Sequence, residues 1–137
     1  MANGHRTQIK RERNAAQRET RPHAKLSYAR IPTQKACFVM DAIRGKDVAT
    51  AEAILTYNTR YASEVILKLL KSAVANAENN MGMNPANLYI AECMAFDGPM
   101  LKRVQPRAQG RAYRILKRMS NLTIVLDERK AEPAAEE

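Results

Sequence analysis

The chain has 137 residues, and its 23 Lys and Arg against 14 Asp and Glu give a formal net charge of +9. This length suits one folded domain. No stretch approaches the roughly 18 apolar residues that span a bilayer, and no apolar segment typical of a secretory signal occurs near the start. We therefore expect a cytoplasmic protein that does not span a membrane. The 2 Cys and 2 His are too few for a zinc site, so we expect no metal and no cofactor.

The positive charge is concentrated in two segments. Residues 1–30 have a net charge of +6, and residues 99–118 have a net charge of +7 with no acid at all. Residues 31–98 and 119–137 have net charges of −1 and −3. A surface selected only for solubility mixes signs over short distances. Two concentrated basic segments instead indicate a polyanionic partner, either nucleic acid or an anionic membrane face.

The N-terminal segment, residues 1–22, contains only one large apolar residue, Ile9. It cannot bury enough surface to offset the entropy lost on ordering, so we expect a flexible basic arm. Its candidate nucleic-acid-binding residues are Arg6, Lys10, Arg11, Arg13 and Arg18.

Residues 23–127 have the patterns of one α+β domain. Leu26 and Tyr28 alternate with small and polar residues, which predicts a short strand over 24–30. Helical spacing of apolar residues then predicts three helices: one capped by Thr33 and ending before Gly45, one from Asp47 to Asn58, and one over 60–79. The apolar stripes are Ala36, Val39, Met40 and Ile43; Val48, Ala51, Ile54 and Leu55; and Ala62, Ile66, Leu69, Leu70, Ala73 and Ala77.

Two further strands are predicted, over 87–96 and 119–126. In the first, Leu88, Ile90, Met94 and Phe96 share one face, although Glu92 interrupts the alternation; in the second, Leu122, Ile124 and Leu126 do so. This order of elements predicts a small three-stranded antiparallel sheet packed on three helices, with a long protruding hairpin and the basic arm. Residues 128–137 are expected to form an acidic disordered tail.

The connection between these last strands, residues 97–118, is far longer than an ordinary hairpin loop. Its prolines and glycines predict two extended arms that turn around between Pro106 and Gly110, with a positive φ at Gly110. Each arm of about ten residues would reach roughly 30 Å. The seven cations on this narrow strip need a counter-charge, which a phosphate backbone supplies. They are Lys102, Arg103, Arg107, Arg111, Arg114, Lys117 and Arg118.

Two other interpretations of this connection are a solvated basic loop and an amphipathic membrane segment. In a solvated loop the interleaved Leu101, Val104 and Tyr113 would be exposed to water with no partner to cover them. In an amphipathic membrane helix Pro99 and Pro106 would interrupt the helix, so we expect no membrane partner. RNA is favoured over duplex DNA because no pair of helices has the basic recognition helix of a helix-turn-helix motif. A thin arm suits folded RNA, which has crevices between its helices.

Four stretches, in order, carry a family resemblance: KACFVMDAIRGK (35–46), LLKSAVANAENN (69–80), FDGPMLKRVQPRAQGRAYRILKR (96–118) and SNLTIVL (120–126). Over residues 24–127 the chain resembles the universal family of large-subunit ribosomal proteins that has number twenty-two in the bacterial naming. The resemblance implies a structural, non-enzymatic protein that binds large-subunit rRNA early in assembly, beside neighbouring ribosomal proteins. It also implies a hairpin that lines the nascent-peptide exit tunnel near the macrolide site.

The resemblance further implies roles for individual residues. Lys35 and Arg44 match rRNA contacts of the first helix, and Arg111, Arg114, Lys117 and Arg118 match phosphate contacts of the returning hairpin arm. Six residues match the tunnel-lining tip region, where the nascent peptide would pass: Lys102, Arg103, Arg107, Ala108, Gln109 and Gly110.

Two rival functions are an RNA-modifying enzyme and an architectural DNA-binding protein. Catalysis needs titratable groups that cluster in a pocket, whereas the acids are scattered and the two histidines lie in or beside the arm. Recovery with large ribosomal subunits after a high-salt wash, rather than with chromosomal DNA, separates the ribosomal interpretation from the DNA-binding one.

Overall fold

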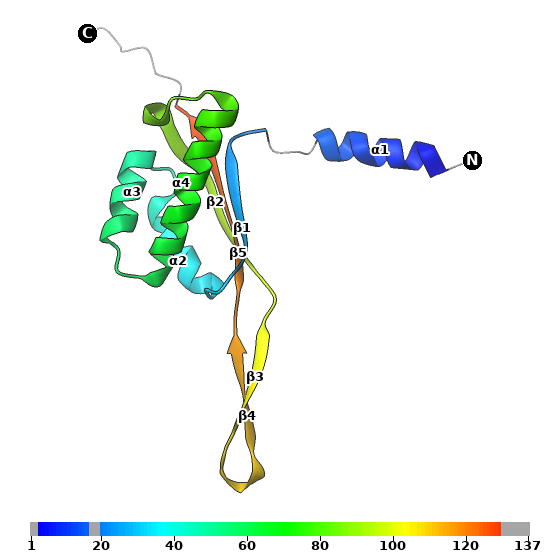
Figure 1. Cartoon of the computed structure of the whole chain (residues 1–137), viewed down its shortest axis with the longest axis vertical. Coiled ribbons are helices and arrows are strands. Elements are labelled where there is room, and N and C mark those ends of the chain that lie inside the picture. The colour runs from blue at the N-terminus through cyan, green and yellow to red at the C-terminus, as the bar shows by residue number, and fades with distance from the viewer. Residues whose placement is uncertain (1–2, 17–19, 130–137) are drawn as a thin grey trace.

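The computed structural model describes residues 3–16 and 20–129. They form an α+β fold with an elongated two-stranded ribbon at one end (Figure 1). The elements in chain order are α1 (Asn3–Ala16), β1 (His23–Ala29), α2 (Thr33–Ile43), α3 (Val48–Tyr57), α4 (Tyr61–Met81), the 3-10 turn η1 (Pro85–Asn87), β2 (Leu88–Asp97), β3 (Leu101–Pro106), the 3-10 turn η2 (Ala108–Gly110), β4 (Ala112–Lys117) and β5 (Ser120–Glu128).

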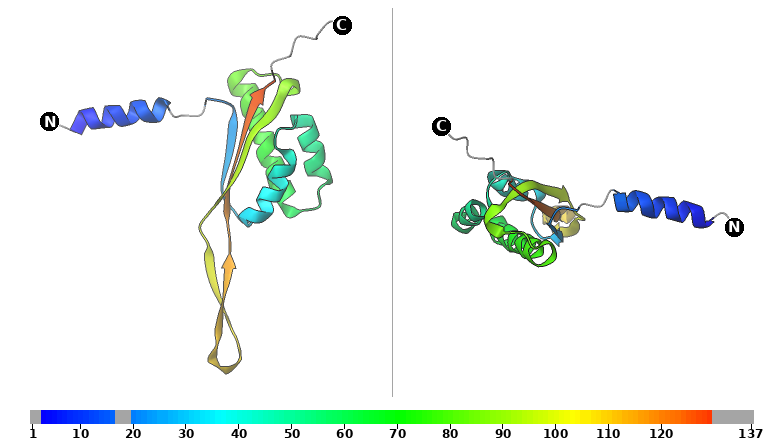
Figure 2. Two further views of the ribbon diagram at one scale, coloured as in Figure 1. Left: turned by 180° about the vertical axis from the view of Figure 1, so that it is seen from behind. Right: turned by 90° about the horizontal axis from the view of Figure 1, so that it is seen from above.

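The main sheet has the strand order β1-β5-β2, and both pairings are antiparallel. Helices α2, α3 and α4 lie together on one side of it, with α2 packed on β2 and α4 on β1 and β5 (Figures 1 and 2). This arrangement confirms the α+β class and the three-stranded antiparallel sheet. Strand β5 enters the sheet directly from the ribbon, so its central position anchors the ribbon to the best-packed part of the body.

The helical stripes predicted from the sequence form the core. Every residue of the α2 and α4 stripes is buried, and in α3 only Ile54 is partly exposed. Buried apolar area of this kind contributes about 25 cal/mol per Å² to folding. Helix α4 ends at Gly82, whose φ of +65° is the left-handed conformation that glycine adopts at helix ends.

The predicted strand faces are wrong where a bulge reverses the alternation. The β2–β5 register shifts between Ile90 and Glu92, so Cys93 points into the core while Phe96 is exposed. The β1–β5 register also shifts, between Leu26 and Ala29. Tyr28 has a φ of +60° there and is exposed rather than sharing a face with Leu26. Each bulge inserts one residue and sends the following side chains to the opposite face.

The start of α2 also differs from the prediction. Pro32 occupies the N-cap position, and the Thr33 side chain makes no capping bond. Thr33 Oγ1 instead donates a hydrogen bond to Asp97 Oδ1 at 2.5 Å. Because Asp97 is the last residue of β2, this bond ties the beginning of α2 to the base of the ribbon.

The N-terminal segment has regular structure that the sequence analysis did not predict. Residues Asn3–Ala16 form α1, a fourth helix, and its side chains from residue 7 onward are exposed. Lys, Arg, Gln, Glu and Ala all favour helices, and backbone hydrogen bonds within one segment need no core. A helix of 14 residues on its own is marginal in water, so the predicted flexibility of the arm remains a prediction.

Residues just outside the range 23–127 also contact the body. Pro22 is buried, and its carbonyl oxygen accepts a hydrogen bond from Leu126 N at 2.9 Å. At the other end β5 continues to Glu128, and Arg129 Nη1 lies 3.3 Å from Asp47 Oδ1. The rest of the expected acidic tail, 130–137, lies outside the described residues. None of the helices in the described ranges has the length and apolar character to cross a bilayer.

Candidate nucleic-acid interface

Strands β3 and β4 form a separate two-stranded antiparallel sheet, called here the β3–β4 ribbon (residues 101–117). It continues the long axis of the molecule away from the helices (Figures 1 and 2). All of its residues are exposed. An isolated pair of strands is marginally stable in water. The ribbon therefore presents its whole surface and has little packing of its own to stabilise it.

Cations and apolar residues face each other across the ribbon. Four consecutive cross-strand pairs each join one cation to one apolar residue, and no two cations are directly opposite, which avoids the repulsion of like-charged pairs. The pairs are Leu101 with Lys117, Lys102 with Leu116, Arg103 with Ile115, and Val104 with Arg114. Successive pairs lie on alternate faces. Each face therefore has both cations and apolar groups, and neither is suited to lie flat on a membrane.

The ribbon ends in a tight turn. Gly110 has a φ of +67°, which confirms the predicted conformation, and Gln109 also has a positive φ of +59°. Arg107 N donates to Arg111 O at 2.8 Å, and the Arg107 guanidinium lies 5.7 Å from the centre of the Tyr113 ring. Arg107, Ala108, Gln109 and Gly110 thus occupy the tip.

Lys102 and Arg103 do not lie at the tip. They are the second and third residues of β3, close to the body, and pair with Leu116 and Ile115. The antiparallel register separates them from the turn, so the structure does not bring together all six residues of the expected tip region. Both remain on the same basic strip as the other ribbon cations.

The ribbon cations are not paired with any acid that the structure describes. Among the described residues, none of the seven cations of segment 99–118 forms an ion pair. Arg118 Nη1 lies 3.6 Å from Met100 Sδ, and Arg103 Nη1 donates to Lys102 O at 3.2 Å. At the base, Gly98 N donates to Met119 O at 2.8 Å and joins the two arms where they leave the sheet. The ribbon charge is therefore available to an external anion.

The two candidate cations at the two ends of α2 differ. Lys35 is exposed and has no acidic partner within the described ranges, whereas Arg44 lies 2.9 Å from Asp41 and donates to the Cys93 carbonyl oxygen at 3.2 Å. Cys93 and, next, Asp41 raise the pKa of the Arg44 guanidinium. Arg44 therefore holds the end of α2 against β2, in addition to any contact that it makes with RNA.

The candidate cations of the N-terminal segment are only partly described. Lys10, Arg11 and Arg13 are exposed on α1. Arg6 belongs to α1, but its side chain lies outside the description, and Arg18 lies outside the described residues. No group of three or more His, Cys, Asp or Glu that could hold a metal ion occurs within 3–16 and 20–129.

Sequence analysis missed a hollow of about 470 Å³ between the start of α2 and the start of α4. It is lined by Arg30, Ile31, Pro32, Lys35, Phe38, Arg60, Tyr61 and Ala62. One signal in the sequence could have found it: Phe38 lies off the apolar stripe of its helix, and an aromatic residue at such a position is exposed. The lining by Arg60, Tyr61 and Ala62 could not be predicted from the sequence, because residues 30–38 and 60–62 meet only in the folded chain.

Comparison with known proteins gives a family for this arrangement. Residues 24–127 match the family described as Ribosomal protein L22p/L17e. The chain is 70% identical over 129 residues to large ribosomal subunit protein uL22 of Lachnospira eligens, an alignment that covers 94% of this chain and 100% of the relative. The protein of the same name from Lachnoclostridium phytofermentans has the same identity and coverage.

A relative with the same name, from Clostridium tetani, is 56% identical over 103 residues, which are 75% of this chain and 93% of that relative. Members of the family are structural components of the ribosome and not enzymes. The chain belongs to the L22p/L17e family of ribosomal proteins and is a structural constituent of the large ribosomal subunit.

Proposed function

We propose that the chain binds and organises large-subunit rRNA during assembly of the subunit in the cytoplasm, next to neighbouring ribosomal proteins. We also propose that its β3–β4 hairpin lines the nascent-peptide exit tunnel near the macrolide site. The observation that carries the rRNA proposal is the alternation of cations and apolar groups on both faces of the ribbon. The tunnel proposal rests on the family resemblance and on the exposed tip.

A partner that binds only one side of the ribbon leaves half of its cations and apolar side chains in water. Folded RNA can surround a thin element, because phosphates line the crevices between its helices. Cations on each face can then displace counterions, and the apolar groups between them can lie against sugars and base faces. The two-stranded ribbon, marginal alone, gains stability from both kinds of contact.

The other candidate cations extend this interface beyond the ribbon. Lys35 lines a hollow together with Arg30 and Pro32, which also line the base of the ribbon, and α1 presents Lys10, Arg11 and Arg13. We propose that these residues, together with Arg6, Arg18 and Arg44, add phosphate contacts. The Lachnospira eligens alignment includes more residues than 24–137 contain, so it extends into the N-terminal segment. That relative therefore has a counterpart for part of the arm.

The proposal predicts a strong salt dependence of rRNA binding. Each phosphate contact contributes a slope of about 0.7 to 0.9 in log K against log salt concentration. In the test variant the seven cations of segment 99–118 are replaced by Gln; in the control, Lys68 and Lys71 on the exposed side of α4 are replaced. We expect a clearly smaller slope and weaker rRNA binding only for the first variant. Equal slopes for both variants would disprove the rRNA contact of the ribbon.

The tunnel position has its own test. Deletion of Ala108, Gln109 and Gly110 removes the tip and leaves the cation–apolar pairs of the ribbon intact. If the tip lines the tunnel, large subunits with this variant will assemble but change their macrolide affinity. Unchanged macrolide affinity in assembled subunits would disprove the tunnel position. The proposal that the ribbon binds rRNA would still stand.

A further inference from the structure

The hollow at the junction of α2 and α4 combines exposed aromatic rings with cations that have no acidic partner in the described part of the chain. Phe38 and Tyr61 are 66% and 65% exposed, although Phe side chains are usually buried. The Arg60 guanidinium lies 5.7 Å from the centre of the Phe38 ring. Arg30 and Lys35 complete the charged rim. The hollow therefore offers flat apolar surfaces surrounded by positive charge.

The arginines that line this hollow differ from the other arginines of the body in their ion pairs. Arg21, Arg44 and Arg129 each form an ion pair, with Glu92, Asp41 and Asp47 respectively. The two body arginines without an ion pair in the described ranges, Arg30 and Arg60, both line this hollow. The lining contains no acid. A charged rim without acids is complementary to an anion, and the rings provide a stacking surface.

The hollow also adjoins the base of the ribbon. A second hollow shares Arg30 and Pro32 with the first and is lined in addition by Leu101, Arg103, Leu116, Lys117, Arg118 and Met119. Cations therefore line both hollows, and Arg30 belongs to each. An RNA strand that contacts the ribbon base can reach the aromatic rings past Arg30.

We propose that this junction binds an unpaired nucleotide of the rRNA, with its base stacked on Phe38 or Tyr61 and its phosphates held by Arg30, Lys35 and Arg60. This assignment rests on the proposed rRNA function. Single-stranded nucleotides are commonly recognised by base stacking on aromatic rings and arginine planes with nearby cations. A neighbouring ribosomal protein is the alternative occupant, and the experiments below exclude or establish it.

The first test is photochemical. The full-length chain is bound to protein-free large-subunit rRNA, irradiated with ultraviolet light and analysed by mass spectrometry. We expect nucleotide adducts at Phe38 or Tyr61 and none at Tyr57, a matched aromatic on α3 that is 88% exposed and lies outside the hollow. Adducts at Tyr57 alone would overturn the proposal, and so would the absence of adducts at all three aromatic residues. So would crosslinks from the junction to another protein, and not to RNA, in assembled subunits.

The second test separates stacking from charge. Phe38→Leu with Tyr61→Leu keeps apolar volume but removes the rings, and we expect rRNA affinity to fall between about 5-fold and 100-fold, as for one lost stacked base. Arg60→Gln lowers the salt slope, whereas the control Tyr57→Leu changes neither quantity. All sites are exposed, so an unchanged melting temperature will show that the variants fold.

The outcomes also separate this inference from the proposed function. If the ribbon variant loses rRNA affinity while the Phe38 and Tyr61 variant binds like the wild type, only the nucleotide site is refuted. If the wild-type chain does not bind rRNA, or the ribbon variant binds equally well, the proposed function itself fails.

Discussion

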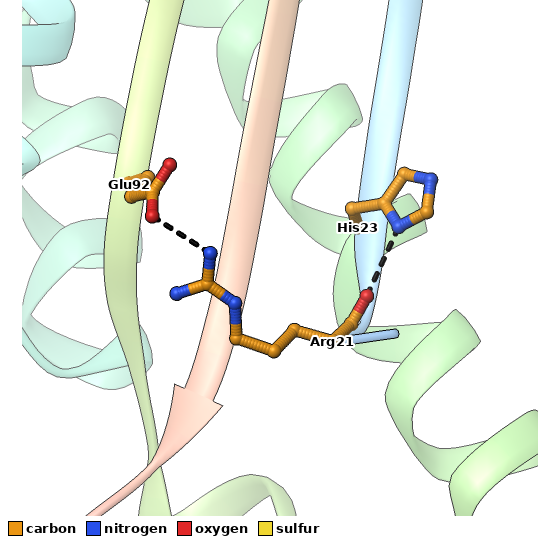
Figure 3. Close-up of polar contacts among 3 residues, drawn as sticks. All are labelled: Arg21, His23 and Glu92. Atoms are coloured by element: carbon orange, nitrogen blue, oxygen red, sulfur yellow. Dashed lines mark hydrogen bonds and ion pairs between the residues drawn. The ribbon is translucent and has the colours of Figure 1, made fainter. Parts of the chain in front are cut away.

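Arg21 Nη2 donates to Glu92 Oε1 at 2.7 Å, and the side chain of Arg21 reaches this carboxylate across the central strand β5 (Figure 3). The Arg21 carbonyl oxygen lies 3.0 Å from His23 Nδ1. Glu92 is the residue that interrupts the alternation of β2, and it immediately follows the bulge. Arg21, which belongs to the basic N-terminal segment, therefore links the two edge strands of the sheet, β1 and β2.

We expect this ion pair to contribute little to stability. The two side chains are 33% and 41% exposed, and ion pairs of this kind contribute up to about 1 kcal/mol. In a double-mutant cycle with Arg21→Gln and Glu92→Gln, the coupling free energy from chemical denaturation should stay below about 1 kcal/mol and fall with added salt. A salt-independent coupling of several kcal/mol would show that the pair is a main determinant of the sheet.

The body should fold without the ribbon. Gly98 and Met119 are joined by a backbone hydrogen bond of 2.8 Å, so a short turn can replace residues 99–118. Because the ribbon residues are exposed and the core lies elsewhere, we expect cooperative thermal unfolding to persist with a similar melting temperature. The measurement is calorimetry of the replaced and wild-type chains. Loss of the cooperative transition would mean that the ribbon is an integral part of the core.

The two cysteines should differ in reactivity. Cys93 is 3% exposed and donates from Sγ to Met40 O at 3.2 Å, and burial raises the pKa of its thiol above the ordinary 9.0, although Arg44 partly opposes the rise. Cys37 is half-buried. At neutral pH a thiol reagent should label Cys37 first, because thiolate is the reactive form. The Cys37→Ala variant isolates Cys93, whose labelling should be slow in the native protein and fast in denaturant.

The same pKa shift has a consequence for stability. The thiol of Cys93 keeps its proton to a higher pH in the folded state than in the unfolded state. As pH rises through 9, the unfolded chain loses this proton first, and the free energy of unfolding falls. The decline should be smaller in the Cys93→Ala variant, measured by denaturation at several pH values. An identical decline in both chains would assign it to other groups.

The tip should tolerate glycine better than alanine. Gly110 has a φ of +67°, where a side chain costs about 1 kcal/mol or more. Gly110→Ala should therefore loosen the turn and weaken rRNA binding, whereas Gln109→Gly, which relieves the positive φ of +59°, should not. Binding measured at one fixed salt concentration compares the two variants. Equal losses would show that the turn conformation is unimportant for binding.

The helices could be predicted closely because a regular 3.6-residue stripe has no local exception in α2, α3 or α4. The strand faces could not, because the bulges before Glu92 and before Ala29 are set by pairing with β5. The basic connection was recognised by composition alone, since seven cations without an acid need a counter-charge. The β3–β4 register places cations opposite apolar residues and not opposite each other. It could not be predicted, because it depends on how the two strands pair in the folded chain.

The aromatic hollow could not be predicted for a different reason. Arg30 and Lys35 lie at least 25 residues before Arg60 and Tyr61 in the sequence, and only the packing of α2 against α4 brings them to one rim. Charge counts treat all body arginines alike. The ion pairs of Arg21, Arg44 and Arg129 show which ones already have a partner in the fold.

The central proposal is that rRNA encloses the β3–β4 ribbon, and lysine acetylation tests this directly. Lys102 and Lys117 on the ribbon and Lys68 and Lys71 on α4 are all exposed in the chain. The rate of labelling at each lysine is measured in the free protein and in purified large subunits. We predict strong protection of Lys102 and Lys117 in the subunit. Labelling of these two lysines at their free rates would contradict the account.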